Sequence, residues 1–344
     1  MTLDEVIAMT TMKAAVFEKA QLPWTIRDVE IPEPGSTDVL IKIRASGICG
    51  TDVHITRGHF PVSPPLIPGH EPVGEVVKTG SAVTHLRPGD RVGVPWHQRN
   101  CGRCEWCHRG KPQFCSSVQA TGVTVNGGDA EYMVAPADRC MLLPDNITYE
   151  QAAPIFCAGF TVYSGLKIAH PAPGERIAVL GIGGLGHLGI QFAKALGFTT
   201  IAITGTEDKA PLARELGADD VVVAADDIGK TLMEHGGADV ILATTNSGRH
   251  MSQAILGLRP DGRMVVMGVA DSPIEVAAHD LLGMRRHLIG SSQNNREDLF
   301  EALQLVAQGK VKVMEEVYPF DRIHEAYRRV EEGKVRFRSV VTFE

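Results

Sequence analysis

The sequence lacks any apolar run close to the roughly 18–20 residues needed to span a bilayer. It also lacks a surplus of positive charge, because 34 Lys and Arg face 41 Asp and Glu and the net charge is −7. This balance argues against a nucleic-acid or anionic-membrane partner. The N-terminal residues include two acids, no basic segment and no long apolar stretch, so they do not indicate a secretory signal. We therefore expect a cytoplasmic protein without membrane or nucleic-acid partners.

Internal repeats and low-complexity tracts are also missing, and 344 residues exceed what one hydrophobic core usually serves. From Met12, where we expect the fold to begin after a short extension, to about Tyr149, short apolar runs are broken by Gly and Pro. Turn signals recur about every eight to twelve residues, which predicts a partly open β-barrel. From Gln151 onward, short β-branched runs alternate with helical segments, which predicts a parallel sheet covered on both faces.

The seven cysteines are bunched rather than spread as in a disulfide framework, and this favours metal binding. Four of them form the pattern C-x2-C-x2-C-x7-C, and these are Cys101, Cys104, Cys107 and Cys115. Four thiolates fill a tetrahedral zinc site and leave no position for a substrate, so the pattern predicts a structural zinc. An iron–sulfur cluster is the alternative, but the spacing of seven and the missing Pro after the last cysteine do not fit it. Free buried cysteines are the third interpretation.

A second set of possible ligands is spread along the chain, and each member stands near a Gly. The set is Cys49, His70, Glu71 and Cys157. Each residue alone has an ordinary explanation, such as a buried thiol or a polar loop. Together they supply the Cys and His ligands of a catalytic zinc, which keeps one position open.

A glycine-rich turn follows the apolar segment IAVL and opens a predicted helix. Its residues are Gly181, Gly183, Gly184, Leu185 and Gly186. The glycines allow a tight turn, close approach of the backbone to a pyrophosphate, and close packing of helix on strand. The helix N-terminus then favours an anion, so the segment predicts a dinucleotide site.

The end of the next strand should distinguish NAD from NADP, because an NAD site usually places an acid there for the ribose 2′-hydroxyl. That position is Thr204, and no acid stands there. The residues expected to face the ribose are Thr204, Gly205, Thr206 and Lys209. They favour NADP, while two acids just before Lys209 and the absence of a following Arg keep NAD open.

The chain resembles the zinc-dependent medium-chain alcohol dehydrogenases over nearly its whole length. The resemblance rests on GICGTDVH, PGHEPVGEVVKTG, the four-cysteine segment, CAGFTVYSGLK, GIGGLGHLGIQFAKALG and LGADDVV. It is most similar to the branch with yeast-type, bacterial and cinnamyl alcohol dehydrogenases. The resemblance implies an α/β protein with a GroES-like β-rich catalytic domain of residues 1–155 and 290–344. A Rossmann domain with a doubly wound parallel sheet would occupy residues 156–289.

The same resemblance implies a role for each site residue. Cys49, His70 and Cys157 would bind the catalytic zinc, with Glu71 as an exchangeable fourth ligand. Asp52 would orient His70, Thr51 would take the proton from the alcohol, and His54 would pass it on through the cofactor ribose.

Two aromatic residues resemble positions that line the alcohol cleft of the family, and these are Phe60 and Trp96. They predict a narrow apolar slot for primary aliphatic or flat aromatic alcohols and aldehydes. The family also implies a homo-oligomer, either a tetramer or a dimer. A polyol dehydrogenase is the alternative, although that branch usually has Glu where Cys157 stands. A zinc-free reductase and a non-catalytic cofactor-binding protein of the same fold are further alternatives.

Overall fold

The computed structural model describes residues 10–270 and 272–344, so the extension expected before Met12 lies almost wholly outside the described residues. The chain forms two compact units. Unit 1 ends at Cys157 and resumes with Met314–Glu344, and unit 2 is Ala158–Val313. Among the described residues, no helix is long and apolar enough to cross a membrane.

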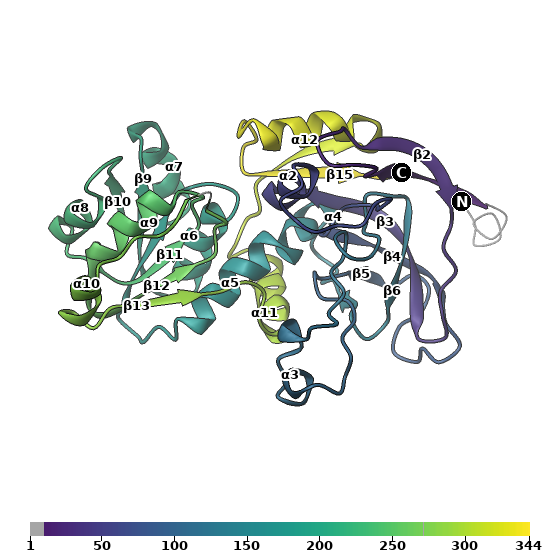
Figure 1. Cartoon of the computed structure of the whole chain (residues 1–344), viewed down its shortest axis with the longest axis horizontal. Helices are drawn as coiled ribbons and strands as arrows, with labels where there is room; N and C mark the ends of the chain where they lie inside the picture. The colour runs from purple at the N-terminus through teal and green to yellow at the C-terminus, as the bar shows by residue number, and fades with distance from the viewer. Residues whose placement is uncertain (1–9, 271) are drawn as a thin grey trace. The chain divides into compact units, whose positions relative to one another are not determined.

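Unit 1 is built on a seven-stranded sheet in which β3 is the longest strand (Figure 1). The strand order is β14–β15–β3–β4–β5–β7, and β6 also pairs with β3. The strands are β3 (Asp38–Ile48), β4 (Pro72–Thr79), β5 (Arg91–Gly93), β6 (Tyr132–Pro136), β7 (Met141–Leu142), β14 (Glu315–Pro319) and β15 (Arg338–Thr342). A separate antiparallel pair is formed by β1 (Thr11–Val16) and β2 (Thr25–Glu30).

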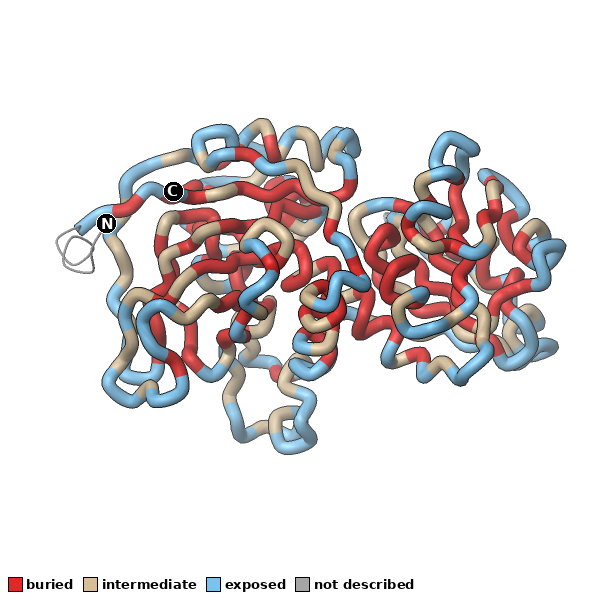
Figure 2. Tube along the Cα trace, turned by 180° about the vertical axis from the view of Figure 1, so that it is seen from behind, coloured by how far each residue is buried: buried red, intermediate tan, exposed pale blue. Residues whose placement is uncertain are grey.

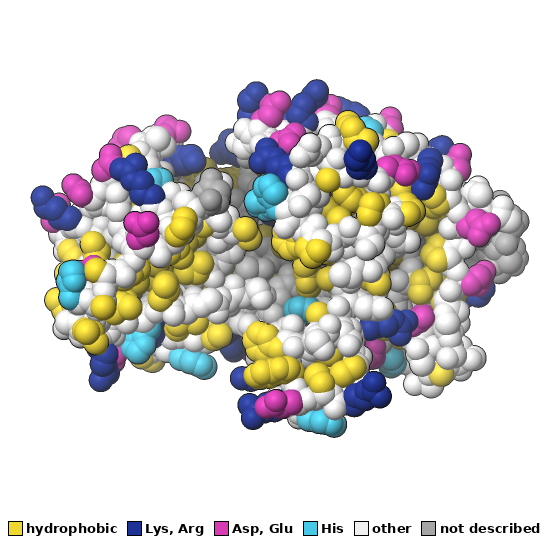
Figure 3. Space-filling view, in the orientation of Figure 1, with side chains coloured by type: hydrophobic (Ala, Val, Ile, Leu, Met, Phe, Trp, Pro, Cys, Tyr) yellow, Lys and Arg dark blue, Asp and Glu magenta, His cyan; other side chains and the backbone are white. Residues whose placement is uncertain are grey.

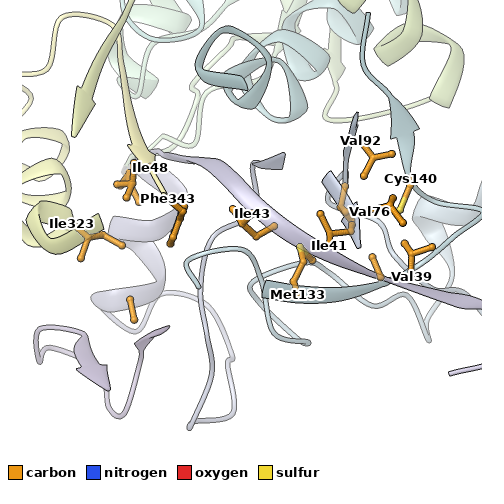
Figure 4. Packing of buried hydrophobic residues seen from close by; sticks show 14 of the residues in the cluster. Val39, Ile41, Ile43, Ile48, Val76, Val92, Met133, Cys140, Ile323 and Phe343 are labelled. Carbon is orange, nitrogen blue, oxygen red and sulfur yellow. The ribbon is translucent and has the colours of Figure 1, made fainter. Parts of the chain in front are cut away.

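The core of unit 1 is made by side chains from several strands of this sheet (Figure 4). Val39, Ile41 and Ile43 of β3 alternate along the strand and point into one apolar cluster, as a period of two requires. The C-terminal segment adds Ile323 and Phe343 to the same cluster. The last residues of the chain therefore complete the β-rich unit.

The helices of unit 1 are short and lie between strands along the chain. They are α2 (Gly50–Thr56), α3 (Glu105–His108), α4 (Tyr149–Ala152) and α12 (Ile323–Glu331), with 3-10 turns η1 (Pro112–Phe114), η2 (Ala153–Phe156) and η5 (Phe320–Arg322). Cys140, which matches no motif, is buried in the core and its thiol donates to the carbonyl of Pro136 at 3.5 Å.

Unit 2 is a six-stranded parallel sheet in the order β10–β9–β8–β11–β12–β13. Its strands are β8 (Arg176–Leu180), β9 (Thr199–Thr204), β10 (Asp220–Val223), β11 (Ala238–Ala243), β12 (Leu258–Val266) and β13 (His287–Gly290). Counted from β8, the order is 3-2-1-4-5-6, which is that of a doubly wound dinucleotide-binding sheet. The central strands are buried (Figure 2), because a parallel sheet is covered on both faces.

The helices of unit 2 lie before, between and after these strands. They are α5 (Ala158–Ile168), α6 (Gly186–Ala195), α7 (Ala210–Glu215), α8 (Ile228–Glu234), α9 (Gly248–Ala254), α10 (Ala278–Leu282) and α11 (Arg296–Ala307), with 3-10 turns η3 (Glu207–Lys209) and η4 (Ile255–Gly257).

Residues 290–313, expected in the β-rich domain, lie in unit 2. Two sets of contacts bind them there: Ser164 of α5 donates to Asp298 of α11 at 2.7 Å, and Gln191 of α6 exchanges two hydrogen bonds with the backbone of Lys312.

Candidate metal centres and dinucleotide site

Four possible metal ligands meet at one end of the unit 1 sheet. The ligand atoms of Cys49, His70, Glu71 and Cys157 all lie within 4.8 Å of one another. Cys49 Sγ is 3.0 Å from His70 Nε2. Three of the four residues are buried, and Cys157 is half-buried.

The antiparallel pairing of β3 with its neighbours explains this meeting. Cys49 comes directly after the last residue of β3, while His70 and Glu71 come directly before β4. Antiparallel partners place the end of one strand beside the start of the other, and Ser46 of β3 is paired with Pro72 of β4. Cys157 follows the buried turn η2, whose Phe156 packs where a Cβ on Gly93 would stand.

Asp52 holds both Cys49 and His70 in place from the first turn of α2. Its Oδ2 accepts from the backbone N–H of Cys49 at 2.8 Å, which is half of a capping box. Its Oδ1 is 3.2 Å from Nδ1 of His70. A carboxylate on Nδ1 leaves Nε2 of the same ring for the metal position. Asp52 is fully buried, and this burial raises the pKa of its carboxyl group while the ring of His70 opposes the rise.

Arg338 is a member of this centre that the sequence patterns did not reveal. It begins β15, whose next residue, Ser339, is paired with Ile48. Its guanidinium donates to Oε1 of Glu71, and both side chains are buried. The other carboxylate oxygen of Glu71 has no hydrogen-bond partner. Burial raises the pKa of Glu71 to about 7, against the opposing charge of Arg338.

The donor set fits a zinc ion. It offers two sulfurs, one imidazole nitrogen and a buried carboxylate with an unpaired oxygen. The hydrogen bond from Cys157 lowers the pKa of Cys49 well below its usual value, against the effect of burial, and His70 adds to the lowering. A thiolate is the form of cysteine that binds a metal.

The four-cysteine segment forms a second cluster on a lobe of residues 100–117, which contains α3. The thiols of Cys101, Cys104, Cys107 and Cys115 lie within 4.8 Å of one another. Cys104 and Cys107 are 3.5 Å apart at sulfur, too far for a disulfide, and all four are free. Only Cys115 is buried. Sulfur-only donors at this spacing also fit a zinc ion.

Thr51 and His54 share the short helix α2 with Asp52. The backbone N–H of Thr51 donates to Cys49 Sγ at 3.3 Å, so the threonine lies beside the metal ligands. His54 lies further along the helix and is half-buried, and its Nδ1 is 3.1 Å from Nδ1 of His59.

One of the two aromatic residues expected in the substrate cleft, Trp96, lies beside this centre. The ring of Trp96 is edge-on to the ring of His70, with centroids 5.4 Å apart. Phe60 and Trp96 both pack against a small buried cluster that includes Ile55. Trp96 therefore forms part of the wall around the ligand cluster.

The glycine-rich turn of unit 2 joins β8 to α6 as expected. Gly181 has a φ of +94°, a region that favours glycine. A Cβ on Gly186 would lie 1.9 Å from the carbonyl oxygen of Gly181, so close packing excludes a side chain there. A Cβ on Gly183 would meet nothing within 4 Å, which leaves open space beside the backbone. Gly184 and Leu185 complete the turn before α6.

A cavity of about 150 Å³ lies at the end of β9. Three of the residues expected to face the ribose, Thr204, Gly205 and Lys209, line it, and none of the described residues that line it is acidic. Thr206 is not among the lining residues, because its backbone closes a turn onto the hydroxyl of Thr204. His250 of α9 also lines the cavity, and no sequence motif pointed to it.

Comparison with known proteins agrees with both units. The alcohol dehydrogenase GroES-like domain family matches residues 35–145, and the zinc-binding dehydrogenase family matches residues 184–308. An alcohol dehydrogenase of Geobacillus stearothermophilus is 42% identical over 96% of this chain and 99% of its own length.

Solved structures agree as well. Cinnamyl alcohol dehydrogenase from Sorghum bicolor is 31% identical with a TM-score of 0.89, over 96% of this chain and 97% of that chain. Acetophenone reductase from Geotrichum candidum, solved in complex with NAD, is 29% identical with a TM-score of 0.88, over 98% of both chains.

The fold and the two ligand clusters define a two-domain oxidoreductase that uses zinc and a nicotinamide cofactor. The chain belongs to the zinc-dependent medium-chain alcohol dehydrogenases, in the group that includes the cinnamyl alcohol dehydrogenase branch.

Proposed function

We propose that this enzyme transfers hydride reversibly between NADP and primary alcohols or their aldehydes, both aliphatic and aromatic. The observation that carries the proposal is the ligand cluster of Cys49, His70, Glu71 and Cys157, with Thr51 and His54 on the helix that Cys49 caps. This arrangement supports a metal position with a route for protons on neighbouring residues.

Cys49, His70 and Cys157 would hold the catalytic zinc, and Glu71 would be an exchangeable fourth ligand. When bound, zinc supplies Lewis acidity, which makes an alcohol acidic enough to lose its proton near neutral pH. Thr51 would accept that proton and His54 would carry it outward through the cofactor ribose. Asp52 would keep the Nε2 of His70 directed at the metal position.

The four cysteines of the lobe would hold a structural zinc. The lobe contains only the short α3 and η1, and Trp106 and Phe114 on it are partly exposed, so it has little core of its own. Figure 3 shows hydrophobic side chains gathered on this lobe. A metal bound by four sulfurs would keep it folded.

The preference for NADP is supported by the cavity at the end of β9. Thr204 stands where an acid would repel a 2′-phosphate, and Lys209 brings a positive charge to the same cavity. His250 adds a second side chain that can donate a hydrogen bond to phosphate.

Replacing Thr204 with Asp tests this preference. Repulsion of the 2′-phosphate should lower the ratio of kcat/KM for NADPH over NADH by about 10- to 100-fold. Thr206→Asp is the matched control, because Thr206 lies outside the cavity lining and should change the ratio much less. An unchanged ratio in Thr204→Asp would show that this cavity does not select the cofactor.

Substrate choice would follow from the aromatic wall. Trp96 and Phe60 would narrow the space beside the ligand cluster and favour unbranched or flat alcohols. One methylene changes binding in an apolar pocket by only about 1–3 kcal/mol, so we expect broad specificity.

A homo-oligomer, either a dimer or a tetramer, is supported by the exposed edge of unit 2. β13 ends the strand order of the sheet, and Leu288 on it is 43% exposed. Leu282 and Val269 are also exposed, at 79% and 57%, and hydrophobic side chains are visible on this unit in Figure 3. Light scattering during gel filtration measures the subunit number, and a monomer would exclude the proposal.

The reaction itself is tested by initial rates of benzaldehyde and butanal reduction with NADPH and with NADH, before and after zinc is removed by a chelator. We expect turnover that depends on zinc and is faster with NADPH. Two zinc ions per chain without turnover on either aldehyde would contradict the proposed substrate class.

A further inference from the structure

His54, the outer residue of the proposed proton route, forms a pair with His59, which the proposed function does not use. Nδ1 of His54 and Nδ1 of His59 are 3.1 Å apart, which is hydrogen-bond distance, and the ring centroids are 5.4 Å apart. His54 is half-buried and His59 is exposed. The pair therefore leads from the inner part of α2 to the solvent.

The end of the helix builds this pair. Gly58 follows the last helical turn with a φ of +79°. Its N–H donates to the carbonyl of Ile55 at 2.9 Å, and the N–H of His59 donates to the carbonyl of His54 at 2.9 Å. These two bonds define a Schellman motif, which brings the residue after the glycine next to the residue five positions earlier.

The hydrogen bond determines which ring nitrogens remain free to accept or release a proton. Two Nδ1 atoms at this distance need one proton between them, so one ring donates and the other accepts. His54 then has only Nε2 left to receive a proton from the direction of the alcohol. His59 has Nε2 left, on an exposed ring, to exchange with water.

We propose that His59 is the terminal member of the proton relay, and that it receives the proton that His54 releases during alcohol oxidation. This inference rests on the proposed role of His54. In the step, His54 takes a proton at Nε2 and gives its Nδ1 proton to Nδ1 of His59. His59 loses its Nε2 proton to water. One proton enters the pair and one leaves, and aldehyde reduction runs the same transfers in reverse.

The charged groups around the pair favour transfer to His59. Arg57 lies between the two histidines in sequence and is paired with Glu331 of α12 at 3.4 Å. Burial lowers the pKa of His54, and the nearby charges of His59 and Arg57 lower it further, while the thiol of Cys49 opposes them. A proton on His54 therefore passes readily to a more exposed neighbour.

The test compares His59→Gln, His54→Gln and the double variant in the zinc-loaded enzyme. The measurements are kcat and KM for alcohol oxidation from about pH 5.5 to about pH 9, a range that spans histidine titration. We expect His59→Gln to lower kcat by about three- to tenfold near neutral pH with little change in KM, and His54→Gln to lower it more. The double variant should be no slower than His54→Gln, because members of one relay do not act additively.

A small base should replace the lost histidine. Added imidazole should bring the activity of His59→Gln close to that of the wild type at the same imidazole concentration, a comparison that corrects for binding of imidazole to zinc. His279→Gln is the control, because the side chain of His279 is 85% exposed and belongs to no site described above. It should match the wild type at every imidazole concentration.

A readout independent of turnover is the ring nitrogen NMR spectrum. In the wild type, Nδ1 of His54 and Nδ1 of His59 should share one hydrogen bond, and His59→Gln should raise the pKa of His54 by removing a neighbouring charge. Unchanged nitrogen chemical shifts of His54 in His59→Gln would contradict the hydrogen bond between the two rings and overturn the inference.

The variants distinguish failure of the inference on His59 from failure of the proposed function. If His54→Gln slows oxidation and His59→Gln does not, the inference on His59 fails and the proposed function stands. If the two losses multiply in the double variant, His59 acts outside the relay and the inference also fails. If His54→Gln itself has no effect, the proposed role of His54 fails and takes the inference with it.

Discussion

The two ligand clusters of unit 1 have similar donor atoms, but one is formed by residues close in the sequence and the other by residues far apart. The cysteines of the lobe span residues 101–115, and three of the four are only half-buried. The other cluster draws on residues 49–157 and three of its four members are buried. Local spacing is enough to build the lobe, whereas strand pairing and a buried arginine build the other. We therefore expect a metal to organise the lobe, and the fold of unit 1 to organise the buried cluster before any metal binds.

The largest expected effect comes from breaking the buried cluster. Cys49→Ser replaces a thiolate with a poor zinc ligand and should lower kcat/KM by at least about 1000-fold. The zinc content, measured by metal analysis, should fall from two ions per chain to one, and the fold should be retained. Cys140→Ala is the control, since this core cysteine lies in neither cluster and its replacement should leave both ions. Two retained ions with full turnover in Cys49→Ser would refute the ligand assignment.

The next effect concerns the charge balance of the buried cluster. Arg338→Met leaves Glu71 buried without its partner and should lower the free energy of unfolding by about 3–5 kcal/mol. Adding Glu71→Gln should recover much of this loss. Urea unfolding of the metal-free protein measures both.

The control for this prediction is a more exposed ion pair. Arg329 binds both oxygens of Glu316, at 2.7 and 2.9 Å, but the two side chains are 35% and 26% exposed. Arg329→Met should cost about 1 kcal/mol or less. Equal losses in the two variants would mean that burial of the Arg338 pair is energetically unimportant.

The lobe should respond differently to the loss of one ligand. Cys104→Ser should remove one zinc ion and increase amide exchange in residues 100–117, because the lobe has little core to hold it. Amides of β3 should keep their protection, and kcat should fall by less than about tenfold. Loss of protection across unit 1 would show that the lobe supports the whole unit.

The smallest effect is a pH dependence at His97, which lies in the sequence between Trp96 and the first lobe cysteine. Burial lowers the pKa of His97 to about 4, and Arg139 contributes to the lowering. The usual pKa is about 6.5, so between these values the unfolded chain holds a proton that the folded chain does not. The free energy of unfolding should therefore fall as pH drops from about 6.5 to about 4.

His97→Gln should remove about 1 kcal/mol of this acid destabilisation, a fraction of the full effect because the ring is not completely buried. Unfolding midpoints at pH near 7 and pH near 4.5 measure it. His279→Gln, on an exposed residue, should leave the pH dependence unchanged. The same slope in His97→Gln and wild type would contradict the assignment.

Much of the fold could be predicted from local patterns. The alternation of strands and helices after Gln151 predicts the parallel sheet, and the glycine spacing predicts the turn between β8 and α6. The place of residues 290–313 was not predictable in this way. The helical pattern of α11 shows one apolar face but not its partner, and the hydrogen bonds to Ser164 and Gln191 that bind this segment to unit 2 span more than a hundred residues.

The candidate site divides along the same line. Spacing predicted the cluster of the four lobe cysteines, and residue types together with a resemblance of motifs predicted the scattered cluster. Arg338 had no signal of its own, because a lone Arg in a terminal strand is ordinary until β15 pairs with β3. His250 had no signal either, because a lone His in a helix is ordinary until the fold brings it to the cavity that Thr204 and Lys209 line. His59 had a local signal, since Gly58 after a helical stretch predicts a cap that folds back on His54.

The turns, the helix caps, the cysteine lobe and the glycine-rich turn between β8 and α6 follow from the sequence alone. Their contacts close within a few residues, so residue type and spacing determine them. The buried ligand cluster, its pairing of Glu71 with Arg338, and the cavity shared by Lys209 and His250 were decided only by the tertiary structure. These features join residues whose meeting depends on which strands become neighbours, and a single sequence does not display that choice.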